Sequence, residues 1–592
     1  MAARAGLRLG VWPALLAAWI GPVPAAGHEV TLDIEPRWSG VLLPVPSPEL
    51  AASDGQHVRV TRLAALIGEV VLHRTDGSEV RLEGQHGFFD AAGGRRRIRL
   101  GAVPAGEYDG LSVVVGVPAA VNHADPGRWP PGHPLHPLVN GLHWSWQGGY
   151  VFTALEGHWR AAGEGSEQGF LYHLATEALR RRVTFRSGFR VAGDHEVRLA
   201  WDVARAFRGR RIDPGAGSDS THSAAGDVLA PQLAEALARG WFWLGDAAVP
   251  AGAGAPAGNP GSPAPPGTPV AFVVPGGFPQ PNLPADNPLT REGVELGRRL
   301  FADSRLSRTG TQACVSCHHP GNALADRVAL SRGLRGATGP RNAMPLFNLA
   351  WSPAFGWDGG QARVRDQALA AWRHPLEMDT EPAAVADELA RDPTLASLAH
   401  GAFGAGGLTV ERILLALEQY LLTEVSADSR FDRARRGEAA LTAPERRGLE
   451  LFMTEHDPAR GQRGADCFHC HGGALFTDFG FRRNGLAAEG SDRGRGEVTG
   501  RAEDGGRFKT PSLRNVALTA PYLHDGSVAT LEEVVARYDH GVIRSPNLDP
   551  SLAKHPPAGL SLSVEDQAAL VAFLRALTDP RLGAGSTGPA GG

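Results

Sequence analysis

Two short motifs constrain this chain of 592 residues more strongly than any other feature. Cys314-Val-Ser-Cys317-His318 and Cys467-Phe-His-Cys470-His471 both follow the pattern C-x-x-C-H. In such a motif the two thiols form thioether bonds with the vinyl groups of a haem, and the adjacent imidazole ligates the iron. A zinc knuckle or a disulfide pair is the alternative, but two complete copies that use all four cysteines favour covalent haem. The sequence therefore predicts two haem c groups.

The N-terminus has the pattern of an export signal. Arg4 and Arg8 precede an apolar run from Val11 to Ile20, and small residues follow. Residues 1–27 are therefore predicted to form a secretory signal peptide; a retained anchor is the less favoured alternative, because the apolar run is too short to span a bilayer. Covalent haem attachment in bacteria takes place after export, so we expect a periplasmic protein with no membrane span in the mature chain. The net charge of −4 gives no field that would attract nucleic acid.

Residues 28–245 are predicted to form an all-β sandwich, because short β-like runs alternate with turn pairs such as Asp76-Gly77. Residues 246–284 are rich in proline, glycine and alanine and are predicted to be a linker. The β-like runs are 30–34, 69–73, 79–82, 98–100, 111–115, 149–152, 169–173, 183–185 and 196–201.

The remainder contains an internal repeat. A segment with Gly297, Leu300 and Phe301 precedes the first haem motif, and a similar segment with Gly448, Leu451 and Phe452 precedes the second. In the second copy Thr442 and Glu445 have the spacing of a helix capping box. This repeat predicts two tandem all-α cytochrome c-like domains, at 285–435 and 436–582, followed by a tail at 583–592. Apolar residues at helical spacing predict further helices at 410–425 and 564–577.

Histidine and tryptophan crowd one part of the β-rich region, between Asn122 and Tyr150. A loop with surface histidines and core tryptophans would explain each residue alone, but imidazole also suits copper or zinc. The region resembles MbnP-type periplasmic copper-binding proteins, although those usually carry four cysteines that are absent here. The resemblance implies a copper site, for which His123, His143 and His173 are the candidate ligands. The motifs that carry it are Val115-Gly-Val-Pro118, Asn122-His-Ala-Asp125, Trp144-Ser-Trp-Gln-Gly-Gly-Tyr150 and Leu155-Glu-Gly157.

Residues 280–580 resemble the bacterial di-haem cytochrome c peroxidase and MauG superfamily over nearly their whole length. The resemblance implies that Glu377 is the distal carboxylate of the first haem, that Gln367 is its polar neighbour, and that Trp357 lies between the haems. A carboxylate there can take a proton from peroxide and return it to the departing oxygen. The motifs are Arg341-Asn342, Trp357-Asp-Gly359, Gln367-Ala-Leu369, Pro375-Leu-Glu377-Met378, Ser429-Arg-Phe-Asp432, Pro511-Ser-Leu-Arg-Asn515 and Thr519-Ala-Pro-Tyr-Leu-His524-Asp-Gly526.

The resemblance also implies the remaining metal ligands. Many of the peroxidases have a histidine that caps the first haem, and this chain has none between Pro320 and Pro345, so we expect a five-coordinate iron as in MauG-like enzymes. For the second haem, Tyr538 occupies the position of the peroxidase methionine, with His524 or His540 as the alternative. A calcium ion between the haem domains would be held by Asn342 and the carbonyl oxygens of Thr519 and Pro521.

Together the two resemblances imply a periplasmic enzyme of the MauG/MbnH type fused to its own protein substrate. Such an enzyme uses hydrogen peroxide to form a high-valent di-haem state, which here would oxidise Trp144 or Trp146 in the copper-binding domain. Fusion raises the effective concentration of the substrate. The alternatives are a cytochrome c peroxidase that takes electrons from a small c-type cytochrome or a cupredoxin, and a non-enzymatic electron carrier with a copper-binding module.

Overall fold

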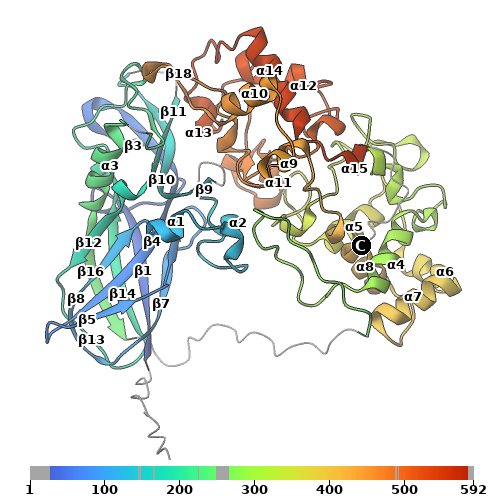
Figure 1. The fold of residues 1–592 in the computed structure, drawn as a ribbon, viewed down its shortest axis with the longest axis horizontal. Helices are drawn as coiled ribbons and strands as arrows, with labels where there is room; N and C mark the ends of the chain where they lie inside the picture. Colours follow the sequence, from blue (N-terminus) through green and yellow to red (C-terminus); the bar gives the residue numbers. More distant parts are fainter. Residues whose placement is uncertain are drawn as a thin grey trace, which may run out of the picture.

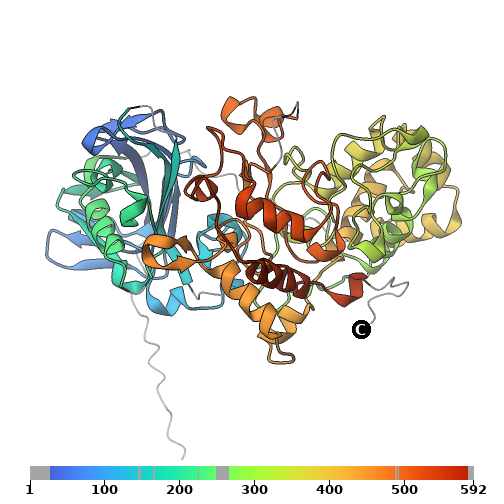
Figure 2. The same ribbon diagram turned by 90° about the horizontal axis from the view of Figure 1, so that it is seen from above.

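The computed structural model describes residues 27–144, 149–163, 167–224, 226–248, 266–486, 490 and 492–583, without the side chain of Asp54. Trp146, most of the signal peptide and nearly all of the predicted tail lie outside these residues. The described chain has a β-rich N-terminal half and a helical C-terminal half (Figure 1). The region of the second haem motif lies between the β-rich half and the region of the first motif (Figure 2).

The β-rich half contains two sheets that share one apolar core, which confirms the predicted sandwich class. One sheet has the order β16 (Trp241–Ala248), β14 (His195–Asp202), β1 (His28–Trp38) and β2 (Val41–Leu42), and β7 (Arg97–Val103) also pairs with β1. β1 and β14 are parallel, whereas the other pairs of this sheet are antiparallel.

The second sheet is larger and carries the residues of the predicted copper region. Its main order is β12 (Arg181–Phe185), β8 (Gly106–Val115), β4 (His57–Arg74), β10 (Gly149–Arg160), β11 (Gln168–Ala175) and β15 (Ser220–Thr221). Short strands extend it: β3 (Leu50–Ala51), β5 (Glu79–Leu82), β6 (Gly87–Asp90), β9 (His143–Trp144) and β13 (Phe189–Val191). All nine predicted β-like runs lie within strands of the two sheets.

Strand β10 is buried at every position from Tyr150 to Trp159, although a sandwich strand normally alternates between buried and exposed residues. The reason is that both of its faces are covered. The apolar core covers one face, and the short helix α13 (Pro550–Ala553) of the second haem region packs against β10 and β11. At Gly169 of β11 the approach is so close that a Cβ atom would lie 2.0 Å from the carbonyl oxygen of Pro550.

Hydrogen bonds also join the two halves. The Nε2 atom of His158 donates to the carbonyl oxygen of Leu548 at 2.8 Å. Arg59 donates to the carbonyl oxygen of Pro546 at 2.6 Å, and Arg460 donates to that of Gly217 at 2.7 Å. These bonds connect strands β4 and β10 and the loop before β15 with the second haem region. The two halves therefore contact each other through specific hydrogen bonds as well as through packing.

The helical half explains the internal repeat. Helix α4 (Arg291–Phe301) packs against α8 (Val410–Thr423), and helix α10 (Ala443–Met453) packs against α14 (Val564–Ala576), one pair in each haem region. Gly297 and Gly448 lie at these contacts, where a Cβ atom would come within 2.0 Å of a carbonyl oxygen of the partner helix. The predicted capping box of Thr442 and Glu445 begins α10.

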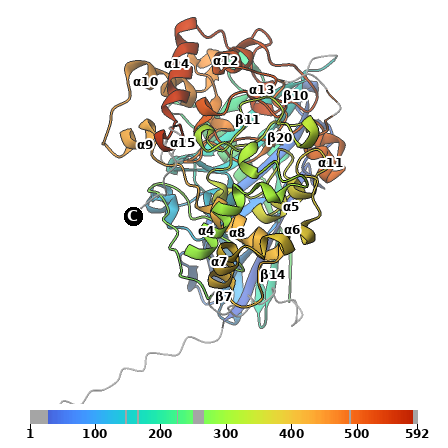
Figure 3. The ribbon, with the colours of Figure 1, turned by 90° about the vertical axis from the view of Figure 1, so that its right-hand side faces the viewer.

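The helices of the described chain are α1 (Ala119–Asn122), α2 (Pro137–Asn140), α3 (Leu229–Ala238), α4 (Arg291–Phe301), α5 (Val364–Arg373), α6 (Pro382–Leu389), α7 (Pro393–Phe403), α8 (Val410–Thr423), α9 (Arg430–Arg435), α10 (Ala443–Met453), α11 (Arg495–Thr499), α12 (Leu531–His540), α13, α14 (Val564–Ala576) and α15 (Pro580–Gly583). Two small hairpins, β17 (His456–Asp457) with β18 (Gln462–Arg463) and β19 (Phe481–Arg482) with β20 (Phe508–Lys509), lie in the second haem region. Figure 3 shows α4 to α8 in front of the β strands. None of the helices in the described ranges is long and apolar enough to cross a membrane.

The predicted linker differs from the structure at both ends. Strand β16 extends to Ala248, and residues 266–284 pack against the first haem region. The Phe278 ring lies 5.2 Å from the ring of Trp351, whose Nε1 atom donates to the carbonyl oxygen of Pro279 at 2.7 Å. Residues 249–265, between these parts, lie outside the described residues. The proline-rich composition did not reveal the two phenylalanines, Phe272 and Phe278, as core residues.

We expect the Gly448→Ala substitution to destabilise the second haem region. The new Cβ atom would lie 2.0 Å from the carbonyl oxygen of Ala569, so α10 and α14 would have to move apart. The free energy of unfolding should fall by about 1–3 kcal/mol, measured by chemical denaturation of the haem-loaded protein. Gly276→Ala is the control, because a Cβ atom there meets no described atom within 4 Å. Equal losses in the two variants would contradict the packing role.

Candidate haem and tryptophan sites

The first haem motif opens into a cavity of about 720 Å³. Cys314, Cys317 and His318 line this cavity, and so do the predicted catalytic residues Gln367 and Glu377, together with Trp357. The structure therefore brings together side chains that are far apart in the sequence. Apolar atoms supply most of the wall, as the ring of a haem requires.

Local backbone structure orients His318. Cys314–Ser316 form a short 3-10 turn, and the hydroxyl of Ser316 accepts a hydrogen bond from the backbone N–H of Ala313 at 3.1 Å. The Nδ1 atom of His318 donates to the carbonyl oxygen of Leu324 at 2.9 Å. Burial lowers the pKa of His318. The ring is therefore neutral, with its Nε2 lone pair free to ligate iron.

Helix α5 and the turn after it hold the polar groups of this cavity. Gln367 lies on α5, and the backbone N–H of Glu377 donates to the carbonyl oxygen of His374 at 3.0 Å. A carboxylate oxygen of Glu377 lies 3.6 Å from Nδ1 of His374. Burial raises the pKa of the Glu377 carboxyl, and His374 opposes this effect. A carboxyl with a raised pKa can both accept and return a proton near neutral pH.

Trp357 connects the cavity to the second haem region. Its Nε1 atom donates to the carbonyl oxygen of Asn342 at 2.8 Å, and the backbone N–H of Asn342 donates to the carbonyl oxygen of His524 at 2.7 Å. The His524 ring stacks on Phe508 at 3.7 Å. These contacts place Trp357 on the side of the first cavity that faces the second region, as the family resemblance implies.

The calcium site stays a prediction. The side-chain amide of Asn342 donates to the carbonyl oxygens of Val328 and Ala329 at 3.2 and 3.0 Å. The backbone bond to His524 places Asn342 beside the turn that contains Thr519 and Pro521. Carbonyl and amide oxygens of this kind are ligands that suit calcium.

The ligands of the second haem motif and Tyr538 are half-buried. The Nδ1 atom of His471 donates to the carbonyl oxygen of Phe476 at 3.3 Å, which leaves Nε2 free for iron. Burial raises the pKa of Tyr538 on α12, and the nearby thiols of Cys470 and Cys467 raise it further.

The two histidines considered as alternatives to Tyr538 lie elsewhere. The side chain of His540 is 62 % exposed and pairs with Asp539 at 3.2 Å, and the ring of His524 is engaged by Phe508. Tyr538 as the second axial ligand stays a prediction.

Trp144 lies at the boundary between the two halves of the molecule. Its ring is 6.2 Å from the ring of Phe468 in an edge-on arrangement. Phe468 directly follows Cys467 in the second haem motif. Trp144 therefore packs against the core of the second haem region as well as against its own domain. Trp146, the other predicted substrate, lies outside the described residues.

The predicted copper ligands are not brought together. His123 is exposed and lies 2.8 Å from Glu177, whereas the ring of His143 packs against Tyr150 at 4.6 Å. His173 is buried at the boundary between the halves, where its ring lies 4.7 Å from that of His222. The predicted set of three is therefore corrected: His173 has other neighbours, His222 and His469, which the sequence reasoning missed.

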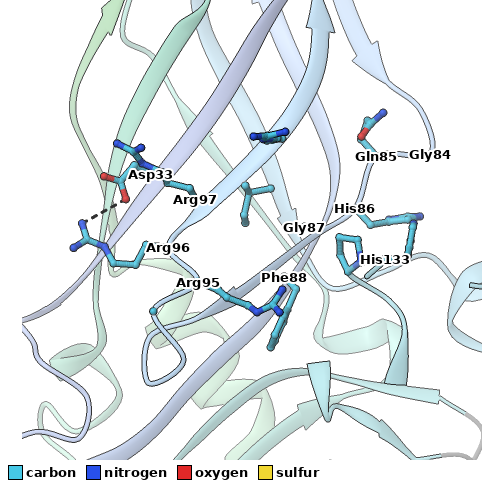
Figure 4. A pocket seen from close by; sticks show the side chains of 14 residues that line it. Asp33, Gly84, Gln85, His86, Gly87, Phe88, Arg95, Arg96, Arg97 and His133 are labelled. Carbon is cyan, nitrogen blue, oxygen red and sulfur yellow. Dashed lines mark ion pairs between the residues drawn. The ribbon is translucent and has the colours of Figure 1, made fainter. Parts of the chain in front are cut away.

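Another cavity of about 720 Å³ lies in the β-rich half (Figure 4). Arginines crowd one side of it, and His86 and His133 lie on another. Most of the positive charge is compensated, since Arg96 lies 3.4 Å from Asp33 and Arg97 lies 2.9 Å from Glu196. Its described lining includes none of the predicted site residues.

Comparisons with known proteins agree with this arrangement. Residues 291–440 match the family model of di-haem cytochrome c peroxidase, and residues 27–223 match the MbnP model. The chain is 37 % identical to the methylamine utilization protein MauG of Methylorubrum extorquens, and the match covers 50 % of the chain and 80 % of that protein. This chain belongs to the di-haem cytochrome c peroxidase/MauG family.

Two further proteins are similar to this chain. Cytochrome c551 peroxidase of Pseudomonas aeruginosa is 33 % identical over 49 % of the chain and 80 % of its own length. A solved structure of a MauG-like protein associated with microbial copper homeostasis is 34 % identical, with a TM-score of 0.48, and the match covers 53 % of this chain and 97 % of that one. The N-terminal part that matches the MbnP model, residues 27–223, is termed the MbnP domain.

Membership of this family implies an oxidoreductase that uses peroxide and carries two haem c groups. The described residues fit both haems. Each motif offers two thiols and an imidazole whose Nδ1 atom donates a hydrogen bond to a backbone carbonyl oxygen. The first motif also opens into a cavity with a mostly apolar wall, which suits the ring of a haem. Bound haem supplies the iron at which peroxide reacts. The catalytic role of Glu377 stays a prediction, to which its place in this cavity and its raised pKa correspond.

Glu377→Gln should slow the reaction with peroxide by roughly 10²- to 10⁴-fold. The wild-type rate should rise with pH, because the proton acceptor is the carboxylate and its raised pKa moves the midpoint above that of an ordinary glutamate. The variant should lose this pH dependence. Stopped-flow absorption spectroscopy of the haems measures both effects. Glu381→Gln, an exposed change four residues later, is the control, and a fast, pH-dependent Glu377→Gln enzyme would contradict the assignment.

Proposed function

We propose that this enzyme uses hydrogen peroxide to oxidise Trp144 of its own MbnP domain to kynurenine. The observation that carries the proposal is the contact between Trp144 and Phe468, whose ring centroids are 6.2 Å apart. Phe468 is bonded directly to the haem-binding residue Cys467. Within its domain, Trp144 is thus the described tryptophan that packs into the core of the second haem region.

The overall reaction is balanced by peroxide and water alone. Two molecules of hydrogen peroxide oxidise one tryptophan to N-formylkynurenine, with release of two molecules of water. The double bond between Cγ and Cδ1 of the indole breaks, and each of these carbons receives an oxygen atom. Hydrolysis of the formyl group then gives kynurenine and formate. The side chain loses four electrons in total, two for each peroxide reduced.

The chain's own residues divide the tasks of this reaction. Glu377 moves the protons of peroxide in the first cavity, and Gln367 supplies a polar group on the same wall. Trp357 lines the first cavity and Phe468 contacts the indole of Trp144, so these two rings are the proposed carriers of oxidising equivalents. An aromatic ring of tryptophan has a delocalised π-system, which makes Trp357 a suitable carrier of oxidising equivalents between the two haem regions.

Fixed docking supports self-oxidation over a diffusing electron donor. The contacts of His158, Arg59 and Arg460 hold the MbnP domain on the second haem region. The substrate side chain therefore stays beside the second motif, and no encounter between separate proteins is needed. We further propose that the enzyme acts in the periplasm, where haem c is attached, and that calcium binds at Asn342, Thr519 and Pro521.

Peptide mass spectrometry of the haem-loaded protein tests the proposal. Treatment with peroxide should convert the peptide containing Trp144 to the kynurenine mass, and Trp144→Phe should abolish the conversion at this position. Replacing His318 should also abolish it, because the first haem would lose its proximal ligand. An unmodified Trp144 peptide, together with rapid peroxide consumption in the presence of a reduced c-type cytochrome or a cupredoxin, would favour a detoxifying cytochrome c peroxidase.

Phe468→Leu should slow the oxidation of Trp144 at least several-fold while peroxide reacts at an unchanged rate in the first cavity. The substitution keeps an apolar side chain of similar size but removes the aromatic ring against Trp144. Val315→Ala, at the equivalent position of the first motif, is the matched control. Quantitative mass spectrometry over time gives the rate of Trp144 oxidation. An unchanged rate in Phe468→Leu would show that the Phe468 ring takes no part in the oxidation.

A further inference from the structure

His374, directly after helix α5, is a second ionisable side chain in the wall of the first cavity. Its Nδ1 atom lies 3.6 Å from a carboxylate oxygen of Glu377, three residues later. This Nδ1 atom is buried and makes no hydrogen bond to any described residue. A buried ring nitrogen normally has a partner, because leaving it unpaired is costly. The acceptor that the geometry offers to it is the carboxylate of Glu377.

The backbone at the end of α5 brings these two side chains together. Pro375 follows His374, and a residue before proline is kept out of the helical conformation. His374 is accordingly extended, with φ −67° and ψ 125°, and α5 ends at Arg373. The carbonyl oxygen of His374 then accepts from the backbone N–H groups of Glu377 and Asp379, both at 3.0 Å. This tight turn places His374 and Glu377 in the wall of the same cavity.

Neighbouring segments hold the turn in place. Nε1 of Trp372 and the hydroxyl of Thr380 donate to one carbonyl oxygen, that of Leu306, at 2.6 and 2.9 Å. The backbone N–H of Leu334 donates to the carbonyl oxygen of Glu377 at 3.1 Å. The backbone of Glu377 is therefore fixed from two segments, and only the direction of its carboxylate is left to be set.

We propose that His374 is a positioning residue for Glu377, whose carboxylate accepts a hydrogen bond from the Nδ1–H group of His374. This bond holds one carboxylate oxygen and leaves the other for peroxide. Glu377 takes a proton from peroxide and returns it to the oxygen that leaves as water, while His374 keeps its own proton. The present distance of 3.6 Å is slightly longer than a hydrogen bond, and such contacts shorten when the reactants bind.

The surrounding charges make His374 the partner of Glu377. Burial raises the pKa of Glu377, and His374 lowers it. Arg308, beside the turn, is engaged by Asp379 at 3.0 Å, and Arg341 in the cavity wall is engaged by Asp358. A hydrogen bond to the carboxylate stabilises its charged form, so the proton acceptor stays available at lower pH. Other charged residues of the cavity wall and of the elements around the turn are Arg305, Arg332, Arg335, Arg373, Glu497 and Lys509.

The pH dependence of the peroxide reaction in the haem-loaded protein tests this role by stopped-flow spectroscopy. His374→Leu removes the donor, so the midpoint should rise by roughly one pH unit and the rate below it should fall about ten-fold. His374→Asn should restore most of the rate, because its amide can donate from nearly the position of Nδ1. Arg373→Gln is the control, since it removes a neighbouring charge that does not shift the pKa of Glu377. A wild-type profile in His374→Leu would overturn the proposal.

A double variant distinguishes positioning from an independent role. If His374 acts through Glu377, the His374→Leu substitution should cause little further loss of rate in a Glu377→Gln protein. The same fold-loss in both backgrounds would overturn the proposal. The inference concerns the reaction of peroxide in the first cavity and does not depend on the oxidation of Trp144, which mass spectrometry reports separately.

Two spectroscopic measurements are independent of activity. Infrared titration of the Glu377 carboxyl band, assigned by its loss in Glu377→Gln, should give a higher pKa in His374→Leu than in the wild type. An equal pKa would overturn the pairing, whatever the rate of peroxide reduction. Resting absorption spectra should show a high-spin ferric first haem in both proteins. A low-spin haem that becomes high-spin in His374→Leu would overturn the proposal, because His374 would then be an iron ligand.

Discussion

The contact of α13 with strands β10 and β11 is the interaction on which the functional arrangement depends. It converts β10 from a strand with one solvent face into one that is buried throughout, which removes apolar surface from water on both sides. The bonds from His158 and Arg59 extend the same contact into the loop before α13. Together with the bond from Arg460 to Gly217 and the pair of His222 with Glu455, this packing holds Trp144 against the second haem motif.

Beside this apolar contact lies a compact group of charges that has a different role. Glu455 is shared by Lys554, His222 and His469, and Asp466 accepts from Lys554 and His555. Buried ion pairs contribute little net stability, because desolvation offsets their attraction. Their value here is directional, since each carboxylate fixes the orientation of a ring at the boundary. Apolar packing thus sets the distance between the halves, and the charges set the angles of the side chains.

The sequence predicted elements well wherever a local pattern decides the structure. The two haem motifs, the strands and the helices that begin each haem region all have such patterns, and the glycines of the repeat mark the helix contacts. The first cavity was predicted residue by residue through family resemblance, because Glu377, Gln367 and Trp357 occupy matching motifs. The same reasoning identified Trp144 and Trp146 but could not choose between them.

What the sequence did not predict arises from contacts between distant segments. His222 follows a strand of only two residues and has no motif around it, so nothing local marks it as a partner of His173. His469 and Phe468 were visible inside the second motif, but their neighbours come from another domain. The expected copper ligands failed as a set because proximity in sequence, between His123 and His143, did not become proximity in space.

The contact between the two halves of the molecule is sensitive to any substitution of Gly169. Its hydrogen in place of a methyl group is what allows Pro550 to approach the sheet at all. A lineage that replaced this glycine would keep every haem ligand, every acid and every aromatic ring, and yet would separate the oxidant from its target. The proposed self-modification is therefore sensitive to one methyl group that is remote from the chemistry.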